Sequence, residues 1–274
     1  MLILLPPSEA KARATSGDPY DLACAPKHLR PVIRKVRTSL IRLCRRQPKT
    51  ARHVLKLGAR GADLITLNAH LDTEPCAPSA QIYTGVLFEH LQVSTMSPHA
   101  QQWAADNLAI SSALFGLVRL TDQIPAYRLS AGTSLPGLEP LPKLWQPALQ
   151  KHLLTDVDAP LIVDLRSGPY AALWRPTADN AQRVVVGKVW QAGVDGQVQA
   201  TSHANKAVKG RLVRDLAHSG VDAAEPPDLA AALTDLGWSV RLHGQQLDIF
   251  WDHTASAAEF NPGHSELAGR HKVP

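Results

Sequence analysis

The chain has 274 residues, of which 45% are hydrophobic and 19% are charged, and its formal net charge is +5. This length supports one large hydrophobic core or two small ones, and the composition excludes a disordered or fibrous protein. The excess of positive charge permits an anionic partner but does not by itself indicate nucleic-acid binding.

The cysteines and histidines give no sign of a metal or cofactor site. The three cysteines, at 24, 44 and 76, have no CxxC spacing, and the 12 histidines are scattered along the chain. A disulfide framework, a structural zinc site, a Walker loop and a dinucleotide fingerprint are therefore not expected. The apolar residues 1–5 stop at two prolines and are too few for a signal peptide or a membrane span. We expect a cytoplasmic protein without a cofactor or a membrane partner, and the sequence specifies no oligomeric state.

The first half of the chain contains one predicted strand and several predicted helices. Residues 2–5 form a short apolar run typical of a buried strand, ended by two prolines. Residues 28–46 and 49–70 have helical patterns on either side of Pro48. Residues 99–118 predict a helix, or a helix followed by a strand. The proline-rich residues 135–147 predict a loop or a hairpin between helices.

The second half is predicted to add strands and one long helix. Residues 161–165 and 183–186 are continuous apolar runs, and residues 238–251 alternate as in a closing hairpin with Gly244 at its turn. Candidate sites recur from one end of the chain to the other. We therefore expect one α+β domain over residues 1–274, with residues 255–274 as a flexible tail.

Much of the positive charge is concentrated in residues 30–56, which contain no acidic residue. The basic residues there are Arg30, Arg34, Lys35, Arg37, Arg42, Arg45, Arg46, Lys49, Arg52 and Lys56. This segment alone predicts a basic face.

Residues 202–216 predict a half-buried helix that carries two unusual lysines. Its apolar positions recur every four residues, at Ala204, Val208, Leu212 and Leu216. Lys209 falls about 60° from the centre of this stripe at 100° per residue. Lys206 lies on the same line of the helix, and Ser202 can cap its first turn. A lysine withdrawn from water needs an anionic partner, an acceptor or a catalytic task, unless its ammonium extends past the core edge.

Other candidate residues follow predicted strands or turns. They are Ser8, Glu9 and Lys11 after the first strand, Tyr83 beside Gly85, Tyr127 and Arg128 after Pro125, and Asp164, Arg166 and Tyr170 at a strand end. Each has a structural alternative. Tyr83 and Tyr127 fit core tyrosines with hydrogen-bonded hydroxyls, Asp164 and Arg166 fit a structural ion pair, and Glu9 fits a loop turn.

Several of these blocks together resemble the YaaA peroxide-stress family. They are the opening MLILLPPSEAK, the turn IYTG at 82–85, LFGLVR at 114–119 with PAYRL at 125–129, VDLRSGPY at 163–170, and the 202–211 helix. The blocks occur in family order from residue 1 to about 252. The resemblance implies a single α+β domain with a curved mixed sheet around helices, a positively charged cleft and a helix-hairpin-helix element. It also implies binding of double-stranded DNA and a role in limiting oxidative damage, without an established catalytic activity.

The chain departs from the family pattern at three places. Leu120 stands where the family usually has proline, and Glu9 stands in a Ser-Glu-x-Lys opening where some members have Ser-Pro-Ala-Lys. Residues 135–139 resemble the hairpin of DNA glycosylases, but Glu139 replaces its second glycine. An acid at that position argues against a phosphate contact there.

Two classes of function remain open. The first is a DNA-binding protein of the oxidative stress response that holds duplex DNA in a basic cleft. The second is an enzyme acting on a nucleobase, a nucleotide or damaged DNA, with Lys206 or Lys209 as nucleophile or base and Asp164 assisting. Candidate contacts to DNA or to a small nucleotide-like ligand are Ser8, Glu9, Lys11, Tyr83, Tyr127, Arg128, Arg166, Tyr170, Ser202 and Arg211. We expect Lys11, both tyrosines, Arg128, Asp164, Arg166 and the two lysines to line one cleft.

Overall fold

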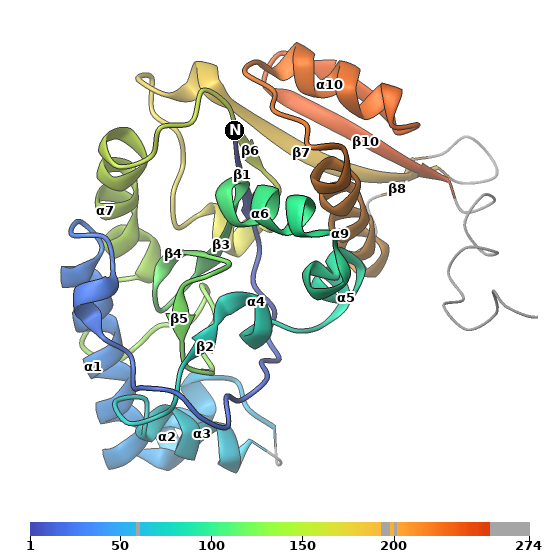
Figure 1. The fold of residues 1–274 in the computed structure, drawn as a ribbon. Coiled ribbons are helices and arrows are strands. Elements are labelled where there is room, and N and C mark those ends of the chain that lie inside the picture. The colour runs from blue at the N-terminus through green and yellow to red at the C-terminus, as the bar shows by residue number, and fades with distance from the viewer. Residues whose placement is uncertain (59–60, 193–197, 200–201, 253–274) are drawn as a thin grey trace, which may run out of the picture.

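A mixed β-sheet runs through the centre of the computed structural model, which describes residues 1–58, 61–192, 198–199 and 202–252 (Figure 1). Its strands are β1 (Leu2–Leu5), β3 (Leu108–Ser112), β4 (Gly116–Arg119), β6 (Ile162–Asp164), β7 (Val184–Ala192), β9 (Ser239–His243) and β10 (Gln246–Asp252). They are arranged in the order β4-β3-β1-β6-β7-β10-β9, and the short β8 (Val198–Gln199) pairs with β7.

The sheet is mostly parallel, which makes the protein a mixed α/β structure rather than the α+β structure that we expected. β1 pairs in parallel with β3 and β6, and β7 pairs in parallel with β6 and β10. Only β4, β8 and β9 run antiparallel to their described neighbours. All four residues of β1 are buried. Parallel strands are covered on both faces and therefore read as continuous apolar runs.

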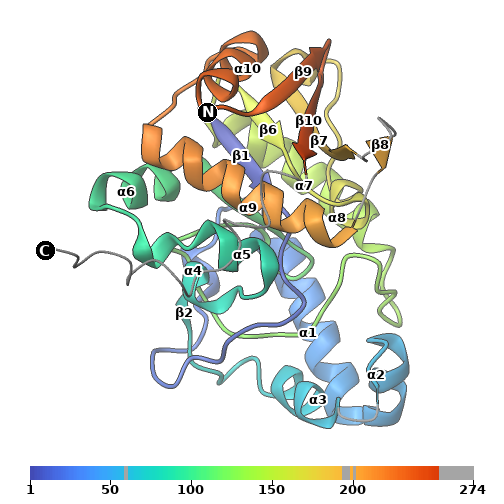
Figure 2. The ribbon, with the colours of Figure 1, turned by 90° about the vertical axis from the view of Figure 1, so that its right-hand side faces the viewer.

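Helices surround this sheet. They are α1 (Arg30–Arg46), α2 (Pro48–Val54), α3 (Ala62–Ala69), α4 (Ser79–Ile82), α5 (Val86–Leu91), α6 (Pro98–Asn107), α7 (Leu141–Thr155), α8 (Gly168–Ala171), α9 (Ser202–Ser219) and α10 (Pro226–Asp235). The short strands β2 (Ala77–Pro78) and β5 (Gln123–Ile124) form a separate pair. Figure 2 shows α6 and α9 on one side of the sheet, whereas α1, α2 and α3 gather at one end of the molecule.

Most of the predicted elements are confirmed, including the strand at 2–5, the first helix, the lysine helix and the hairpin around Gly244. Residues 99–118 form a helix followed by strands. The prediction of one helix over 49–70 was wrong, because residues between Val54 and Ala62, including Gly58 and Gly61, separate α2 from α3. Residues 255–274, the predicted tail, lie outside the described residues.

The prediction of a loop or hairpin over residues 135–147 was also largely wrong. α7 begins at Leu141 and contains Pro147, which removes one helical hydrogen bond. The helix persists because its apolar face, Leu141, Trp145, Leu149 and Leu153, is buried. Residues 125–134 are irregular, so residues 135–139 do not connect two helices.

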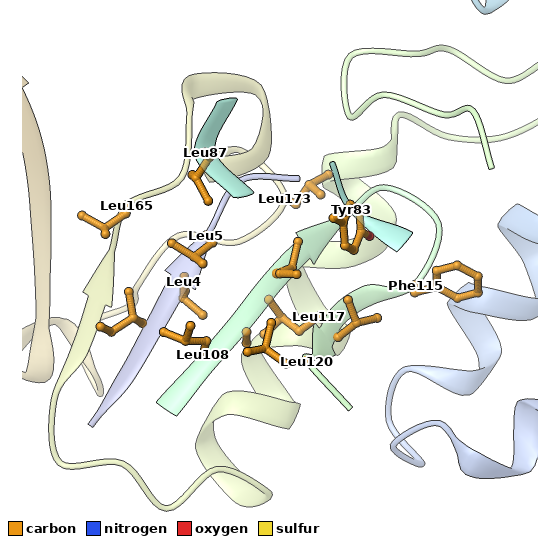
Figure 3. Close-up of a cluster of buried hydrophobic side chains, with 14 of the residues drawn as sticks. Leu4, Leu5, Tyr83, Leu87, Leu108, Phe115, Leu117, Leu120, Leu165 and Leu173 are labelled. Atoms are coloured by element: carbon orange, nitrogen blue, oxygen red, sulfur yellow. The ribbon is translucent and has the colours of Figure 1, made fainter. Parts of the chain in front are cut away.

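The core joins the sheet to the helices that position the candidate residues. In Figure 3, Leu4 and Leu5 of β1 lie between Leu108 of β3 and Leu165, which follows β6. α5 packs closely on α9, and a Cβ atom at Gly210 would collide with the Leu87 carbonyl oxygen. This close packing holds α9, and therefore Lys209, against the core.

Candidate functional site at the carboxyl ends of the central strands

The order of the strands indicates that a binding site lies at the carboxyl ends of the parallel strands around β1. β1 is flanked by β3 on one side and β6 on the other, so the chain changes direction across the sheet at β1. In open sheets of this kind, ligands bind outside the carboxyl ends of the strands where the strand order switches. Ser8, Glu9 and Lys11 follow β1, Ser112 ends β3, and Asp164 ends β6.

The segment after β1 is held against the turn that follows α4. Ser8 Oγ donates to the Ala10 carbonyl oxygen at 2.6 Å and accepts a hydrogen bond from the Thr84 N–H at 3.0 Å. Lys11 forms an isolated antiparallel bridge with Tyr83. Gly85 closes the turn with a φ of 88°, which disfavours any residue with a side chain. These contacts fix the position from which the Lys11 side chain extends.

The Lys11 ammonium lies on two aromatic rings. Its Nζ donates to the Ser8 carbonyl oxygen at 2.8 Å and lies 4.2 Å from the centroid of the Tyr127 ring and 5.2 Å from that of Tyr83. Burial and the positive charge of Arg128 lower the pKa of Lys11 to about 7, and the Glu9 carboxylate opposes that shift. The aromatic faces favour the protonated amine. Lys11 is therefore balanced between its charged and neutral forms near neutral pH.

Tyr83 and Tyr127 are core residues that support Lys11. Their hydroxyl oxygens lie 2.9 Å apart, and Ser112 Oγ lies 2.7 Å from the Tyr127 hydroxyl. Ser112 Oγ also accepts from the Phe115 N–H at 2.9 Å. Burial raises the pKa of both tyrosines. Because their hydroxyl groups are hydrogen-bonded to one another, Tyr83 and Tyr127 contact Lys11 through their aromatic rings.

Arg128 and Glu9 form an ion pair beside Lys11. Arg128 Nη2 lies 2.9 Å from Glu9 Oε2, with the arginine side chain 17% exposed and the glutamate side chain 70% exposed. Two hydrogen bonds to the buried Asn68 side chain fix the Arg128 backbone. Asn68 was not among the predicted site residues, and its only signal in the sequence is an amide between the apolar Leu67 and Ala69 at the end of α3. Glu9 therefore does more than serve a loop turn.

Tyr170 connects this cluster with the end of β6. Burial raises the pKa of Tyr170 to about 12, a hydrogen bond with the Ala131 backbone opposes the shift, and the charges of Glu9 and Arg128 act on it in opposite directions. The Tyr170 carbonyl oxygen accepts from Arg166 Nη1 at 3.2 Å. The side chain of Tyr170 thus faces the first cluster while its backbone contacts the second.

Asp164 and Arg166 form a buried ion pair with two parallel hydrogen bonds. Arg166 Nε donates to Asp164 Oδ1 at 2.8 Å, and Nη2 donates to Oδ2 at 2.7 Å. Arg166 Nη2 also donates to the Trp174 carbonyl oxygen. Both carboxylate oxygens are engaged, which is the geometry of a structural ion pair.

The lysine helix places its two lysines in different environments. Lys209 is 6% exposed and donates to the Leu165 carbonyl oxygen at 2.8 Å, which confirms its predicted withdrawal from water. Burial lowers the pKa of Lys209 to about 8, and Asp164 opposes the shift. Lys206 is exposed. The Arg211 guanidinium lies 6.0 Å from the Trp251 ring centroid, and the Ser202 side chain lies outside the described residues.

The predicted residues therefore form two neighbouring clusters rather than one set around the lysine helix. The loop cluster contains Ser8, Glu9, Lys11, Tyr83, Tyr127, Arg128 and Tyr170. The strand-end cluster contains Asp164, Arg166 and Lys209. No hydrogen bond or ion pair among the described residues joins Lys206 to either cluster.

The predicted basic face forms elsewhere, on α1. Ile33, Val36, Leu40 and Leu43 are buried, so Arg34 and Arg42 project outward, whereas Arg37 is half-buried beside the Tyr20 ring. Part of this surface is a groove of about 490 Å³, lined by Arg34, Arg37, Thr38, Ile41, Arg42, Arg45, Arg46 and Asp72. Asp72 pairs with Arg45 at 2.7 Å. The other lining arginines have no acid beside them in this groove.

Within the described part of the chain, no three His, Cys, Asp or Glu side chains are grouped as metal ligands. None of the helices in that part is long and apolar enough to cross a membrane.

Comparison with known proteins assigns the chain to a family. A family model described as peroxide stress protein YaaA matches residues 1–241. A UPF0246 protein of Streptomyces coelicolor is 39% identical over 243 residues, covering 88% of this chain and 92% of the relative. A UPF0246 protein of Corynebacterium efficiens is 38% identical over 249 residues, covering 89% and 96%, respectively. The chain therefore belongs to the YaaA peroxide stress protein family, as its sequence motifs indicated.

Proposed function

We propose that this protein binds duplex DNA through the basic face of α1 and α2 and acts in this way in the peroxide stress response. The observation that carries the proposal is the groove in which Arg34, Arg37, Arg42 and Arg46 meet a single acid, Asp72. No aspartate or glutamate occurs between residues 22 and 62. Arginines on an exposed helix neutralise phosphates and release counterions, so they bind DNA without reading its sequence.

We propose that α2 and α3 act as the helix-hairpin-helix element that the family resemblance implies. These short helices follow one another in the chain and are joined by residues 55–61, of which 59–60 lie outside the described residues. The Gly61 N–H donates to the Gly58 carbonyl oxygen at 3.0 Å. Lys49, Arg52 and Lys56 are exposed around this connection, where they would add phosphate contacts to those of α1.

The test is duplex affinity as a function of salt. Two unrelated duplexes should bind equally, and log affinity should fall with log salt concentration by about 0.9 per phosphate contact. The double variant Arg42→Gln/Arg46→Gln should weaken both duplexes equally and reduce the slope by about two. Arg241→Gln is the matched control, because Arg241 is exposed on β9 at an edge of the sheet. Salt-insensitive binding, or equal losses in both variants, would remove the basic face as the DNA contact.

The second candidate is an enzyme acting on a nucleobase, a nucleotide or damaged DNA, with Lys206 or Lys209 as nucleophile or base. It is supported by the burial of Lys209 and its pKa of about 8, because a lysine must lose its proton to attack carbon. Lys206→Arg and Lys209→Arg keep the charge but cannot form a Schiff base. Turnover that either substitution abolishes, with duplex affinity retained, would favour the enzyme. Equal turnover, or none in any form, would count against it.

A further inference from the structure

We propose that Lys11 and Arg128 form a binding site for the dianionic phosphate of a phosphate monoester, and that this phosphate displaces the Glu9 carboxylate from Arg128. The site shares no residue with the arginine groove of α1 and does not depend on duplex binding.

The first argument is the position of the site in the fold. Lys11 lies in the segment after β1, at the switch point where ligands bind in open sheets. Arg128 and Tyr170 reach the same place from segments far away in the sequence. Three independent segments thus bring a cation, a second cation and a hydroxyl group together at the edge where ligands are expected.

The second argument is an excess of positive charge in a partly buried place. Arg128 is close enough to Lys11 for its charge to disfavour the ammonium form, and the charge facing both is the Glu9 carboxylate. When Lys11 is protonated, two cations face one carboxylate and one positive charge is left uncompensated. The Tyr83 and Tyr127 hydroxyls are hydrogen-bonded to each other and to Ser112, so they contribute no acceptor for it.

The third argument is the unequal exposure of the ion pair. The Arg128 side chain is 17% exposed and its backbone is fixed by Asn68, whereas the Glu9 side chain is 70% exposed. Exposed carboxylates exchange readily with water and with other anions because water screens their ion pairs. Glu9 can therefore leave Arg128 and become hydrated, which exposes a pre-positioned guanidinium.

The chemistry of the donors selects phosphate. A guanidinium offers two parallel N–H groups that match two oxygens of a phosphate, and an ammonium supplies a second point charge. Tyr170 adds a hydroxyl that can donate to a third oxygen. A phosphate monoester carries a charge of about −1.5 to −2 at pH 7, which matches two cations better than a diester does.

Binding at this site should depend on pH through Lys11. The groups that face its ammonium are Glu9, Arg128, the two tyrosine rings and the Ser8 carbonyl oxygen. An anion favours the protonated form and raises the pKa of Lys11 above its value of about 7. Affinity should therefore be greatest below pH 7 and decline as the pH rises above it. Sulfate remains a dianion throughout this range. The pH dependence of sulfate binding therefore reports the titration of Lys11 without that of the phosphate group.

The experiment is calorimetric titration at constant ionic strength with sulfate, inorganic phosphate, a nucleoside 5′-monophosphate and the corresponding nucleoside. We expect saturable binding of the first three and none of the nucleoside. Lys11→Gln and Arg128→Gln should each weaken binding about tenfold or more, since hydrogen bonds to charged groups contribute roughly that much. Glu9→Gln should tighten it about threefold or more by removing the internal competitor.

Matched controls and a second arm make the outcome decisive. Glu139→Gln removes an exposed acid paired with Lys143, and Arg241→Gln removes an exposed cation on β9; neither should change the binding of these anions. Glu9 is exposed, so Glu9→Gln tests the site even if Lys11→Gln fails to fold. Weak binding that Lys11→Gln, Arg128→Gln and Glu9→Gln all leave unchanged would overturn the proposal. The second arm compares a duplex that carries a 5′-phosphate with the same duplex without it. If Lys11→Gln and Arg128→Gln weakened the binding of both duplexes equally, the site would bind phosphate diesters and the proposal would be overturned.

Discussion

The loop cluster around Lys11 and the basic face of α1 both carry positive charge, but they hold it differently. Most of the arginines that line the α1 groove are exposed, and the groove contains a single acid. Lys11 and Arg128 are held by backbone carbonyl and amide groups, aromatic rings and a carboxylate. Exposed charges attract an extended anion at little geometric cost, whereas fixed charges select one small anion. Positive charge therefore supports two different kinds of recognition.

The largest expected effect separates buried from exposed ion pairs. Arg166→Ala would leave the buried Asp164 carboxylate without its partner and should lower the free energy of unfolding by about 3–5 kcal/mol. Asp72→Ala breaks the exposed pair with Arg45 and should cost only about 0–1 kcal/mol. Chemical denaturation of both variants measures the difference. Equal small losses would mean that the strand-end cluster is not structural.

The next effect concerns the packing of α9, the helix that carries Lys206 and Lys209, against α5. Gly210→Ala would place a methyl group against the Leu87 carbonyl oxygen, so α5 and α9 would have to separate. We expect a loss of about 1–3 kcal/mol, as for other overpacked contacts. Ala207→Gly is a useful comparison on the same helix: it should cost about 1 kcal/mol through helix propensity, plus the loss of one buried methyl group. Thermal unfolding of the two variants decides whether close packing or propensity governs α9.

Lys209 should make stability depend on pH in a definite direction. Burial lowers its pKa in the folded protein to about 8, below that of an unfolded lysine, so the unfolded state binds more protons between about pH 8 and 10. Burying the charged lysine therefore costs stability below pH 8, and this cost is relieved as the pH rises toward 10. The free energy of unfolding of Lys209→Met, relative to that of the wild type, should therefore be higher at pH 7 than at pH 10. A difference independent of pH would show that Lys209 keeps its ordinary pKa.

The smallest effect is expected at Lys206, which is exposed one turn before Lys209. Lys206→Gln should change the free energy of unfolding by no more than about 0.5 kcal/mol. A change as large as that of Lys209→Met would contradict the assignment of Lys206 to the solvent side of α9. Denaturant titration of the two variants under the same conditions is sufficient.

The sequence predicted local features better than neighbours in space. The stripe through Val208 and Leu212 correctly placed Lys209 near the core, because helical periodicity is local. The split between α2 and α3 was missed, because the apolar spacing continues across Gly58 and Gly61. The parallel order of the strands and the contact between Glu9 and Arg128 depend on how distant segments meet. No periodicity encodes such contacts, and Asn68 was missed for the same reason.

The most direct test of two separate anion sites is the salt dependence of duplex affinity in two variants measured side by side. Arg42→Gln/Arg46→Gln should reduce the slope of log affinity against log salt concentration by about two. Lys11→Gln should leave that slope unchanged while it weakens the binding of a nucleoside 5′-monophosphate about tenfold or more. A reduced slope in Lys11→Gln together with an unchanged slope in Arg42→Gln/Arg46→Gln would contradict the account.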